Sequence, residues 1–544
     1  MSHHRGAPRP VRGVLWGVAL FSALLIPRPR PGGLPPAFLR YDPGSPTLID
    51  LWIDPVNGDD TNSGADRAHA LRTVTAAWRR IPAGVPLTSS GYRIMLTAGD
   101  YPGDTFPLYW ESRLGTFTAP VIVQSADGPR AARLQGYVNI YDTRYLYFLD
   151  VAIQNGGDVL HCERCDHLLL RGCLLDGGQR QAHETLKINQ STHVYIEDCE
   201  IRSAWENAID GVAVQYGHVV GNRIHSADDW CIYFKGGSAY LRIEANEIFD
   251  CGTGGFTAGQ GTGFEFMVSP WLHYEAYDIK FVNNLIHHTD GAGMGVNGGY
   301  NILFAHNTLY RVGRRSHVIE VALGGRGCDG DASRCAAHLA EGGWGPAQVG
   351  GDEPIPNRNI FIYNNIVYNP EDWTSRWQHF FISPPLTASP ASHIPSPAHS
   401  DTNLQIRGNV IWNGAADHPL GIEGGEEGCP PANPTCNETQ LRAENAINSL
   451  LPQLQDAAGG NYRPSPDGNL LQATTFAIPP FSWQDAPFPP LVPVGALPNR
   501  IPFDRDGHPR PTPGLAGAYE RPAAAPPGVR WPRRAIPPSR GGSR

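Results

Sequence analysis

The sequence predicts an all-β solenoid, a fold in which short strands repeat coil after coil. One observation is an apolar–X–apolar triplet that recurs across residues 184–322. Another is an Asn that stands before a short alternating segment, in a second series interleaved with the first. The third is composition, because 62 Gly and 50 Pro residues leave few long helical periodicities and favour strands joined by turns. Two interleaved series with one shared period indicate stacked structural repeats.

Both series can be read directly along the chain. The triplets of the first series lie at 186–188, 209–211, 232–234, 264–266, 294–296 and 319–321, with an earlier copy at 159–162. The second series comprises Asn222, Asn246, Asn284, Asn307, Asn365 and Asn409, with Cys173 and Cys199 at the same place in two earlier copies. Asn at one repeated turn position predicts a stacked ladder of side-chain amides with a structural role.

The chain begins with features of a secretory signal. Arg5, Arg9 and Arg12 precede an apolar run at 14–26, which is short for a membrane span. We therefore expect residues 1–30 to be a signal peptide or an uncleaved N-terminal anchor, followed by a linker at 31–50. Either reading predicts a secreted or periplasmic protein.

Residues 51–133 are expected to form an N-terminal cap and the first coils. Leu71, Val74, Trp78 and Ile81 recur at helical spacing and predict one amphipathic helix. A solenoid needs its first coil shielded from water and from edge pairing, and this helix would supply that shield.

Two segments carry a resemblance to a known family. The segment at 52–101, with "WIDPVNGDDTNSG" followed by "LRTVTAAW" and "IMLTAGDY", resembles the opening of bacterial secreted right-handed parallel β-helix proteins of the polysaccharide lyase-like, pectin-lyase-fold families. The segment "FDRDGHPRPTPGLAGAYE" at 503–520 is similar to the closing segment of that family. The resemblance implies a right-handed parallel β-helix with an N-terminal capping helix. The family includes lyases, hydrolases, epimerases and proteins of unassigned activity.

The remaining boundaries follow from where the repeats begin and fade. The β-helix core is expected at 134–414, with loop insertions at 251–263, 269–277 and 324–357. C-terminal coils and the closing segment occupy 415–520, and the Pro- and Arg-rich residues 521–544 predict a disordered tail.

The ten Cys residues fit an exported protein in part. Cys328 and Cys335 share one loop, Cys429 and Cys436 share another with the same spacing, and each pair predicts a local disulfide. Cys162 and Cys165 have the spacing of half a metal site. No matching second pair follows and Cys162 takes an inward position, so we expect a structural role.

Equivalent positions of a parallel coil stack about 4.8 Å apart, so the outward positions of the repeated triplet should form columns. One predicted column contains His161, Lys187, Asp210, Tyr233, Glu265, Gly295 and Glu320. A second, two residues further on, contains Glu163, Asn189, Lys235, Met267 and Asn297. Acids, a phenol, bases and His on one stripe are typical of a polar binding cleft, which we expect here.

The leading hypothesis is β-elimination on an acidic, uronate-containing polysaccharide. Only three of the 43 basic residues are Lys, and two of them, Lys187 and Lys235, take outward positions. Lys can lose its proton when desolvated and Arg cannot, so either Lys is a candidate base. Tyr233 or His161 is the candidate acid that assists the leaving oxygen.

Calcium is the candidate cofactor of that reaction. Asp210 and Glu265 would lie two coils apart, about 10 Å between backbones, and could share one ion at the level of Tyr233. The ion would neutralise the uronate carboxylate during proton abstraction.

Two alternatives remain open beside the lyase. The run "SADDWCIYFKGGS" at 226–238 resembles "GDDCIAIKSGS" of the polygalacturonase-type hydrolases, which implies catalytic carboxylates at Asp210, Asp228 and Asp229. The His expected in the next coil of that family is missing from Gly261-Thr262-Gly263. The other alternative is a non-catalytic glycan-binding surface; an epimerase would share the lyase machinery.

Partners follow from the same features. The expected substrate-binding residues are His161, Asn189, Trp271, His273, Tyr274, Asn297 and Glu320, with the aromatic rings stacking on sugar faces. A net charge of −9 without a basic patch argues against nucleic acid, and the lack of a P-loop or dinucleotide motif argues against nucleotides. The chain is expected to act as a monomer.

Overall fold

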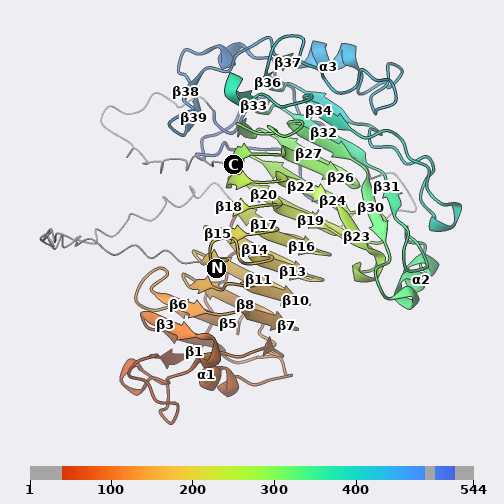
Figure 1. Ribbon diagram of the computed structural model, residues 1–544. Helices are drawn as coiled ribbons and strands as arrows, with labels where there is room; N and C mark the ends of the chain where they lie inside the picture. Colours follow the sequence, from red (N-terminus) through yellow and green to blue (C-terminus); the bar gives the residue numbers. More distant parts are fainter. Residues whose placement is uncertain (1–38, 484–495, 521–544) are drawn as a thin grey trace, which may run out of the picture. The chain divides into compact units, whose positions relative to one another are not determined.

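The computed structural model describes residues 39–483 and 496–520. In these residues, three parallel sheets extend along a stack of successive coils. Between Gly91 and Ile382, each coil adds one strand to sheet A, one to sheet B and one to sheet C in turn (Figure 1). The predicted right-handed parallel β-helix is confirmed.

The sheets are defined by their strands. Sheet A comprises β1 (Leu48–Ile53), β2 (Gly91–Leu96), β5 (Val121–Ser125), β8 (Arg144–Leu149), β11 (Asp166–Arg171), β14 (Thr192–Glu197), β17 (Gln215–Val220), β20 (Ser238–Glu244), β24 (Ala276–Val282), β27 (Gly299–Ala305), β32 (Arg358–Tyr363) and β35 (Gln405–Arg407). Sheet B comprises β3 (Gly99–Pro102), β6 (Ala132–Gln135), β9 (Ala152–Gln154), β12 (Leu174–Asp176), β15 (Glu200–Ala204), β18 (Arg223–Ala227), β21 (Glu247–Cys251), β25 (Leu285–Thr289), β28 (Thr308–Tyr310), β33 (Ile366–Asn369), β36 (Val410–Asn413) and β37 (Ala446–Ile447). Sheet C comprises β4 (Trp110–Glu111), β7 (Val138–Tyr141), β10 (Leu160–Glu163), β13 (Leu186–Asn189), β16 (Ile209–Val212), β19 (Trp230–Lys235), β22 (Gly254–Gly259), β26 (Ala292–Asn297), β29 (Ile319–Ala322) and β34 (Phe380–Ile382).

The remaining elements lie in caps, corners and insertions. They are the strands β23 (Gly261–Gly263), β30 (Gly324–Gly327), β31 (Glu353–Ile355), β38 (Leu454–Asp456) and β39 (Asn461–Pro464), the α-helices α1 (Val74–Arg80), α2 (Ala332–Ala340) and α3 (Glu438–Glu444), and the 3-10 helices η1 (Arg67–His69), η2 (Gly103–Thr105), η3 (Phe264–Phe266), η4 (Glu371–Trp373), η5 (Pro390–Ser392) and η6 (Asn469–Gln472).

The turn between sheets A and B carries the predicted amide ladder, which is confirmed. In each rung the side-chain Nδ2 of one Asn donates to the Oδ1 of the next, as from Asn246 to Asn284 at 3.0 Å and from Asn284 to Asn307 at 3.1 Å. The same oxygen also accepts the backbone N–H of the Asn below, and Nδ2 donates to a carbonyl of sheet A. The preceding residue adopts a left-handed conformation, as Asn283 does with φ of 55°. The buried ladder thus satisfies polar groups at a sharp corner.

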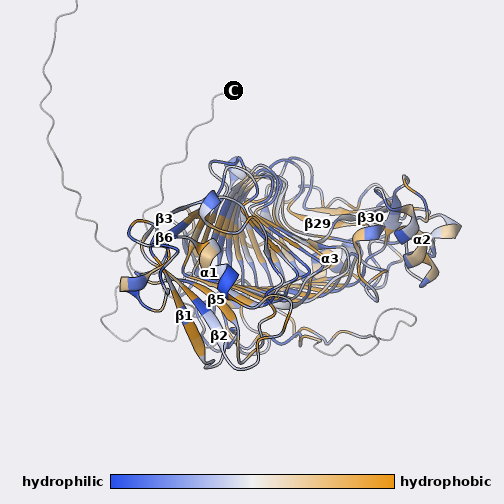
Figure 2. Cartoon of the chain, turned by 90° about the horizontal axis from the view of Figure 1, so that it is seen from below, coloured by the Kyte–Doolittle hydropathy of each residue, from blue (hydrophilic) through white to orange (hydrophobic). Residues whose placement is uncertain are grey.

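Helix α1 closes the first coil, as predicted. Thr73 caps it by accepting the N–H of Ala76, and its buried face consists of Val74, Ala77 and Trp78. The Trp78 ring meets Trp110 of sheet C edge to face at 5.0 Å between centroids. In the view along the coils, α1 lies across the apolar interior (Figure 2).

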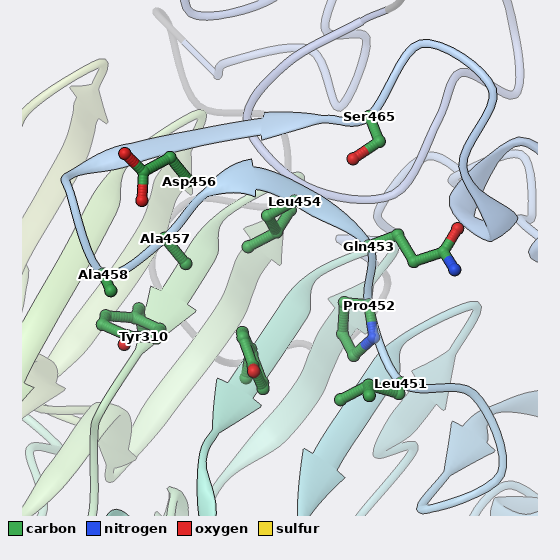
Figure 3. A pocket seen from close by; sticks show the side chains of 10 residues that line it. Tyr310, Leu451, Pro452, Gln453, Leu454, Asp456, Ala457, Ala458 and Ser465 are labelled. Atoms are coloured by element: carbon green, nitrogen blue, oxygen red, sulfur yellow. The ribbon is translucent and has the colours of Figure 1, made fainter.

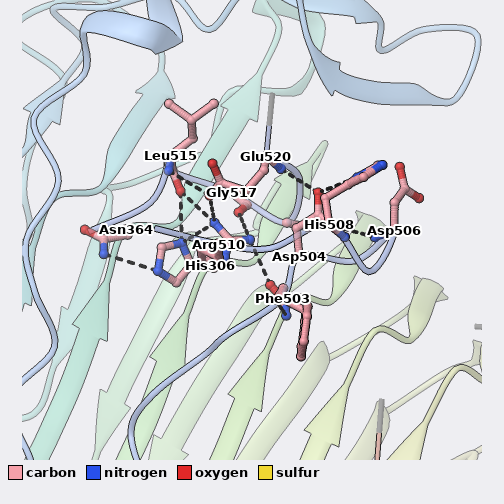
Figure 4. Close-up of polar contacts among 12 residues, drawn as sticks. His306, Asn364, Phe503, Asp504, Asp506, His508, Arg510, Leu515, Gly517 and Glu520 are labelled. Carbon is pink, nitrogen blue, oxygen red and sulfur yellow. Dashed lines mark hydrogen bonds and ion pairs between the residues drawn. The ribbon is translucent and has the colours of Figure 1, made fainter. Parts of the chain in front are cut away.

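The closing segment at 503–520 is fastened to the same corner as the amide ladder. The Asp504 carboxylate, fully buried, accepts the backbone N–H of Glu520 at 2.7 Å. Arg510 donates to the Glu520 carboxylate and, at 3.0 Å, to Oδ1 of Asn283 (Figure 4). The closing segment therefore binds the turn just before the ladder and covers the coil from outside.

Four disulfides hold loops and neighbouring strands. The two predicted pairs, Cys328–Cys335 and Cys429–Cys436, are confirmed. Cys162 and Cys165 have a structural role as expected, and they form a disulfide that the sequence analysis did not assign. Cys231–Cys251 joins sheet C to sheet B and was also not predicted; Cys173 and Cys199 are free and buried below the Asn ladder.

Two insertions follow strands of sheet C and pair with each other. Strand β23 runs parallel to β30, which pairs with β31, and α2 lies in the same unit (Figure 1). Arg326 and Glu275, both fully buried, form an ion pair inside it. Gln190, which follows β13, donates to the carbonyl of Phe266 at 2.9 Å. The insertions therefore reach back to the coil that carries Lys187.

The signal segment or anchor at 1–30 and the tail at 521–544 lie outside the described residues. Across the described ranges, every helix is too short or too polar to span a membrane.

Removing one rung of the ladder should destabilise the fold. Asn284→Ala deprives the N–H and Nδ2 groups of Asn246 of their acceptor and removes two donors, so we expect a loss of about 3 kcal/mol in the free energy of unfolding. Chemical denaturation measures it. The matched control is Asn57→Ala, an exposed Asn that contacts Asp54, for which we expect a change below about 1 kcal/mol. Equal effects of the two substitutions would contradict the structural role of the ladder.

Candidate active site on sheet C

The predicted outward column exists on sheet C. The hydrogen-bonded register aligns His161 with Lys187, Lys187 with Asp210, and Asp210 with Tyr233. Further along the same face, Gly295 aligns with Glu320. Lys187, Asp210 and Tyr233 are therefore neighbours on consecutive strands.

Glu265 does not belong to this column, and its predicted placement is wrong. The strand between β19 and β26 is β22, where Phe256 faces the core and Thr257 aligns with Tyr233. Gly254 and Gly255 interrupt the apolar pattern of this strand. Glycine is required there because a side chain would collide with Trp230 or Ile286. The pattern at 264–266 is a 3-10 helix inside the insertion.

The Glu265 carboxylate has a structural role. It accepts the backbone N–H groups of Asp329, Gly330 and Asp331 at 2.9, 2.6 and 3.2 Å. This fixes the loop that carries the Cys328–Cys335 disulfide. A calcium ion shared by Asp210 and Glu265 does not fit these contacts, because Glu265 is already occupied and Asp210 binds Lys187 instead.

Two carboxylates share one ammonium at the centre of sheet C. The Lys187 Nζ lies 3.0 Å from Asp210 Oδ2 and 3.4 Å from Glu184 Oε2. Both acids are almost completely buried, and the Lys187 side chain is 26% exposed. Tyr233 lies beside this group, because it stands in register with Asp210, and its ring packs on Trp230. The arrangement is a buried pair of acids that contacts one partly exposed ammonium.

Burial and neighbouring charges shift the pKa values of Glu184, Lys187 and Tyr233. Burial, and then the nearby Asp210 carboxylate, raise the pKa of Glu184 to about 8. Burial alone would lower the pKa of Lys187, but the Asp210 and Glu184 carboxylates raise it above its ordinary value. Burial also raises the pKa of the Tyr233 hydroxyl. Lys187 therefore stays protonated, which is the opposite of what the predicted lysine base requires.

His183 connects Glu184 to a further acid. Its Nδ1 lies 2.7 Å from Glu184 Oε2 and its Nε2 lies 2.9 Å from Glu206 Oε2. Glu184, His183 and Glu206 were missed by the sequence analysis, which considered only the alternating positions inside each strand. These residues stand two and three positions ahead of a strand, where the chain turns into sheet C. An acid two positions ahead of the strand, at Asp158 and Glu184, and another three positions ahead of the next strand, at Glu206, were the available signal.

Lys235 and Asp228, two of the other predicted catalytic residues, have partners outside the acid pair. The Lys235 Nζ donates to Gln260 Oε1 at 3.0 Å and lies 4.5 Å from the Tyr233 ring centroid. Asp228 and Asp229 occupy the turn between β18 and β19, where Asp228 pairs with Arg180. The three-aspartate group of the hydrolase hypothesis is therefore not assembled, since Asp210 pairs with Lys187.

The expected aromatic platform on the insertion is buried. Trp271, His273 and Tyr274 are at most 9% exposed and belong to the packing between the insertions and sheet A. His273 Nε2 contacts the Gly342 carbonyl at 3.1 Å. Their placement as sugar-stacking residues is wrong, because the second insertion covers them.

The remaining predicted binding residues do lie on sheet C, in two places. Asn189 Nδ2 lies 3.3 Å from His161 Nε2, beside Lys187. Three coils above Asp210, Asn297 Nδ2 donates to Glu320 Oε1 at 2.9 Å, and His317 Nε2 lies 3.1 Å from Glu320 Oε2. The face thus carries a second polar cluster along the stack.

Several exposed aromatic side chains lie on or next to the strands of sheet C. Among the described residues, the exposed aromatic side chains on or adjoining sheet C strands and their insertions are Tyr109, Tyr141, Trp205, Phe266, Trp377 and Phe381. Phe117 is exposed elsewhere. Exposed rings beside polar groups are typical of a ligand-binding surface.

A hollow of about 380 Å³ lies apart from this face. It is formed where the hairpin of β38 and β39 covers Tyr310 and Tyr368 of sheet B (Figure 3). Leu451, Pro452 and Leu454 complete its apolar wall. It contains none of the residues of the acid pair.

One comparison with known protein families agrees with the observed architecture. A family model described as a right-handed β-helix region matches residues 158–329. No sequence among the curated proteins matches the chain.

The solved structures similar to the chain are distant from it. Pectate lyase Pel9A is 13% identical, over 88% of this chain and 97% of that one, with a TM-score of 0.41. A rhamnogalacturonan lyase is 11% identical, over 66% and 87%, with a TM-score of 0.40. The polysaccharide lyase Pedsa3628 from Pseudopedobacter saltans is 11% identical, over 72% and 94%, with a TM-score of 0.32.

The raised pKa of Glu184 should appear in the pH dependence of stability. Its pKa of about 8 in the folded chain exceeds the ordinary value of 4.5, so folding favours the protonated form. The stability from that proton is complete below about pH 4.5 and is lost as the pH rises through about 8. Glu184→Gln stays neutral throughout. Relative to the unsubstituted chain, its free energy of unfolding should therefore rise on the order of 3 kcal/mol between about pH 5 and pH 8.

Denaturant titrations at several pH values measure this difference. The control for a generic Glu→Gln effect is Glu438→Gln on α3, whose exposed side chain pairs with Arg442. A pH-independent difference for Glu184→Gln would show that Glu184 is ionised in the folded chain.

Proposed function

We propose that this chain is a carbohydrate-active enzyme that cleaves glycosidic bonds of an extended polysaccharide on the outer face of sheet C. In this proposal Glu184 is the proton donor and Asp210 is the charged carboxylate. The observation that carries it is the pair of buried carboxylates on one ammonium, with the pKa of Glu184 raised to about 8.

Two carboxyl groups with different proton affinities are the machinery that glycosidic cleavage requires. Glu184 would deliver its proton to the glycosidic oxygen as the bond from that oxygen to the anomeric carbon breaks. The Asp210 carboxylate would stabilise the positive charge that develops on the sugar. Water then supplies a hydroxyl to the anomeric carbon and returns a proton to Glu184. Lys187 would pair with the Asp210 carboxylate beside a protonated Glu184.

A polysaccharide is favoured by the length and content of the face. Aromatic rings from Tyr109 to Phe381 accompany sheet C from β4 to β34. Glu320, which belongs to the cluster with Asn297 and His317, stands in the same column as Asp210. It lies four coils from Asp210, or about 19 Å along the stack. A chain of several sugar rings could contact both clusters at once.

β-Elimination on a uronate-containing chain is the second candidate, and one observation favours it. The raised pKa of Lys187 keeps its ammonium charged, which suits neutralisation of a uronate carboxylate. In that reaction Lys187 would bind the substrate carboxylate, Asp210 would take the proton next to that carboxylate, and protonated Glu184 would give its proton to the glycosidic oxygen as its bond to the sugar breaks. The two reactions differ in product, because elimination leaves an unsaturated sugar and hydrolysis does not.

The test is product analysis on a panel of neutral and uronate-containing polysaccharides. We expect new reducing ends without the ultraviolet absorbance of an unsaturated sugar. Glu184→Gln and Asp210→Asn should each lower the rate by about a hundredfold or more, because each removes a group acting in proton transfer or charge stabilisation. Glu438→Gln should leave the rate unchanged.

Absorbance accompanying each cleavage would favour elimination over hydrolysis. Binding of a polysaccharide without any cleavage would refute the enzymatic proposal and leave a glycan-binding surface.

A further inference from the structure

We propose that Trp205 and His183 form a sugar-stacking subsite beside the acid pair, and that this subsite takes an uncharged pyranose residue. The inference deepens the proposed function and rests on it for the position of the cleaved bond. It depends on three observations about Trp205: its exposure, its fixation and the charges around it.

Trp205 is a large apolar side chain left open to solvent in the folded chain. It is 49% exposed, although it directly follows the buried end of β15. Its ring lies 4.7 Å from the His183 ring, at an interplanar angle of 38°. Leaving an indole face in water forfeits the free energy of its burial, so such rings commonly serve contacts with a ligand. A sugar ring presents C–H groups that pack on such a face.

The position of Trp205 is fixed by the coil. Its backbone N–H donates to the Ala182 carbonyl at 2.8 Å, and the next N–H, from Glu206, donates to the His183 carbonyl at 3.2 Å. These bonds tie the corner before β16 to the corner before β13. The Trp205 ring is therefore held next to His183, whose Nδ1 lies 2.7 Å from Glu184. One imidazole separates the platform from the proposed proton donor.

The charges around this corner disfavour a uronate. Glu206 lies 2.9 Å from His183 Nε2, and Asp158 Oδ1 accepts the backbone N–H of Glu184 at 3.2 Å. Arg180, on the same loop as His183, is engaged by Asp228 and Asp250. A sugar carboxylate on Trp205 would therefore meet the Glu206 and Asp158 carboxylates, while the Arg180 guanidinium is already paired; sugar hydroxyl groups could instead donate to these carboxylates. The subsite accordingly selects a neutral sugar.

The experiment measures binding in the Asp210→Asn background, so that turnover does not interfere. Calorimetric titrations use cellohexaose, xylohexaose and mannohexaose as neutral probes and hexagalacturonate as the acidic one. We expect at least one neutral hexasaccharide to bind more tightly than hexagalacturonate. Adding Trp205→Ala should raise its Kd tenfold or more, and Trp205→Phe should recover part of that loss. Near-ultraviolet circular dichroism checks that each variant is folded.

The matched control is Phe117→Ala. It removes a ring of similar exposure, 47%, in the segment before β5 of sheet A. It should leave the Kd unchanged. Three outcomes would overturn the subsite: no neutral probe binds, hexagalacturonate binds as tightly as the best neutral probe, or Trp205→Ala leaves the Kd unchanged.

Failure of the proposed function looks different from failure of the subsite. If Trp205→Ala weakens binding of a neutral probe but the unsubstituted chain releases no product, the subsite stands and the cleavage proposal fails. If the unsubstituted chain cleaves a polysaccharide while Trp205→Ala binds and cleaves it unchanged, the cleavage proposal stands and the subsite is refuted.

Discussion

The hydrogen-bonded register between successive coils is the constraint on which the rest of the structure depends. Parallel pairing places equivalent residues about 4.8 Å apart and repeats every inward or outward direction. The Asn ladder locks that register at one corner, since each amide such as Asn284 binds the amides above and below it. A slip of one residue would break the ladder and turn the apolar positions outward.

The same spacing explains the chemistry of the candidate site. Lys187 and Asp210 occupy equivalent positions of adjacent strands, so they meet as an ion pair. Glu184 enters from the preceding corner and reaches the same ammonium while almost fully buried. Because two acids compete for one cation in a poorly solvated place, one of them keeps its proton. The raised pKa of Glu184 therefore arises from packing between coils.

Sequence patterns were most reliable where they reported burial and least reliable where insertions interrupt the coil. The Asn series and the triplets around Lys187, Asp210 and Tyr233 were assigned correctly because their apolar neighbours face the core. The strand β22 was missed because its glycines interrupt the apolar pattern, and the triplet at Glu265 was wrongly predicted to be a strand. Aromatic residues such as Trp271 were expected on the surface, yet the second insertion buries them. Contacts between distant segments were the missing information.

The sequence by itself determined the repeat, the apolar interior, the capping helix and the column of residues His161, Lys187, Asp210 and Tyr233, because periodicity alone decides which side chains face inward. Tertiary structure decided which acids Lys187 binds, why Glu184 retains a proton and which aromatic rings stay exposed. Those properties depend on the distances between neighbouring coils and insertions and on how much solvent reaches the side chains. A local sequence pattern specifies neither the distances nor the solvation.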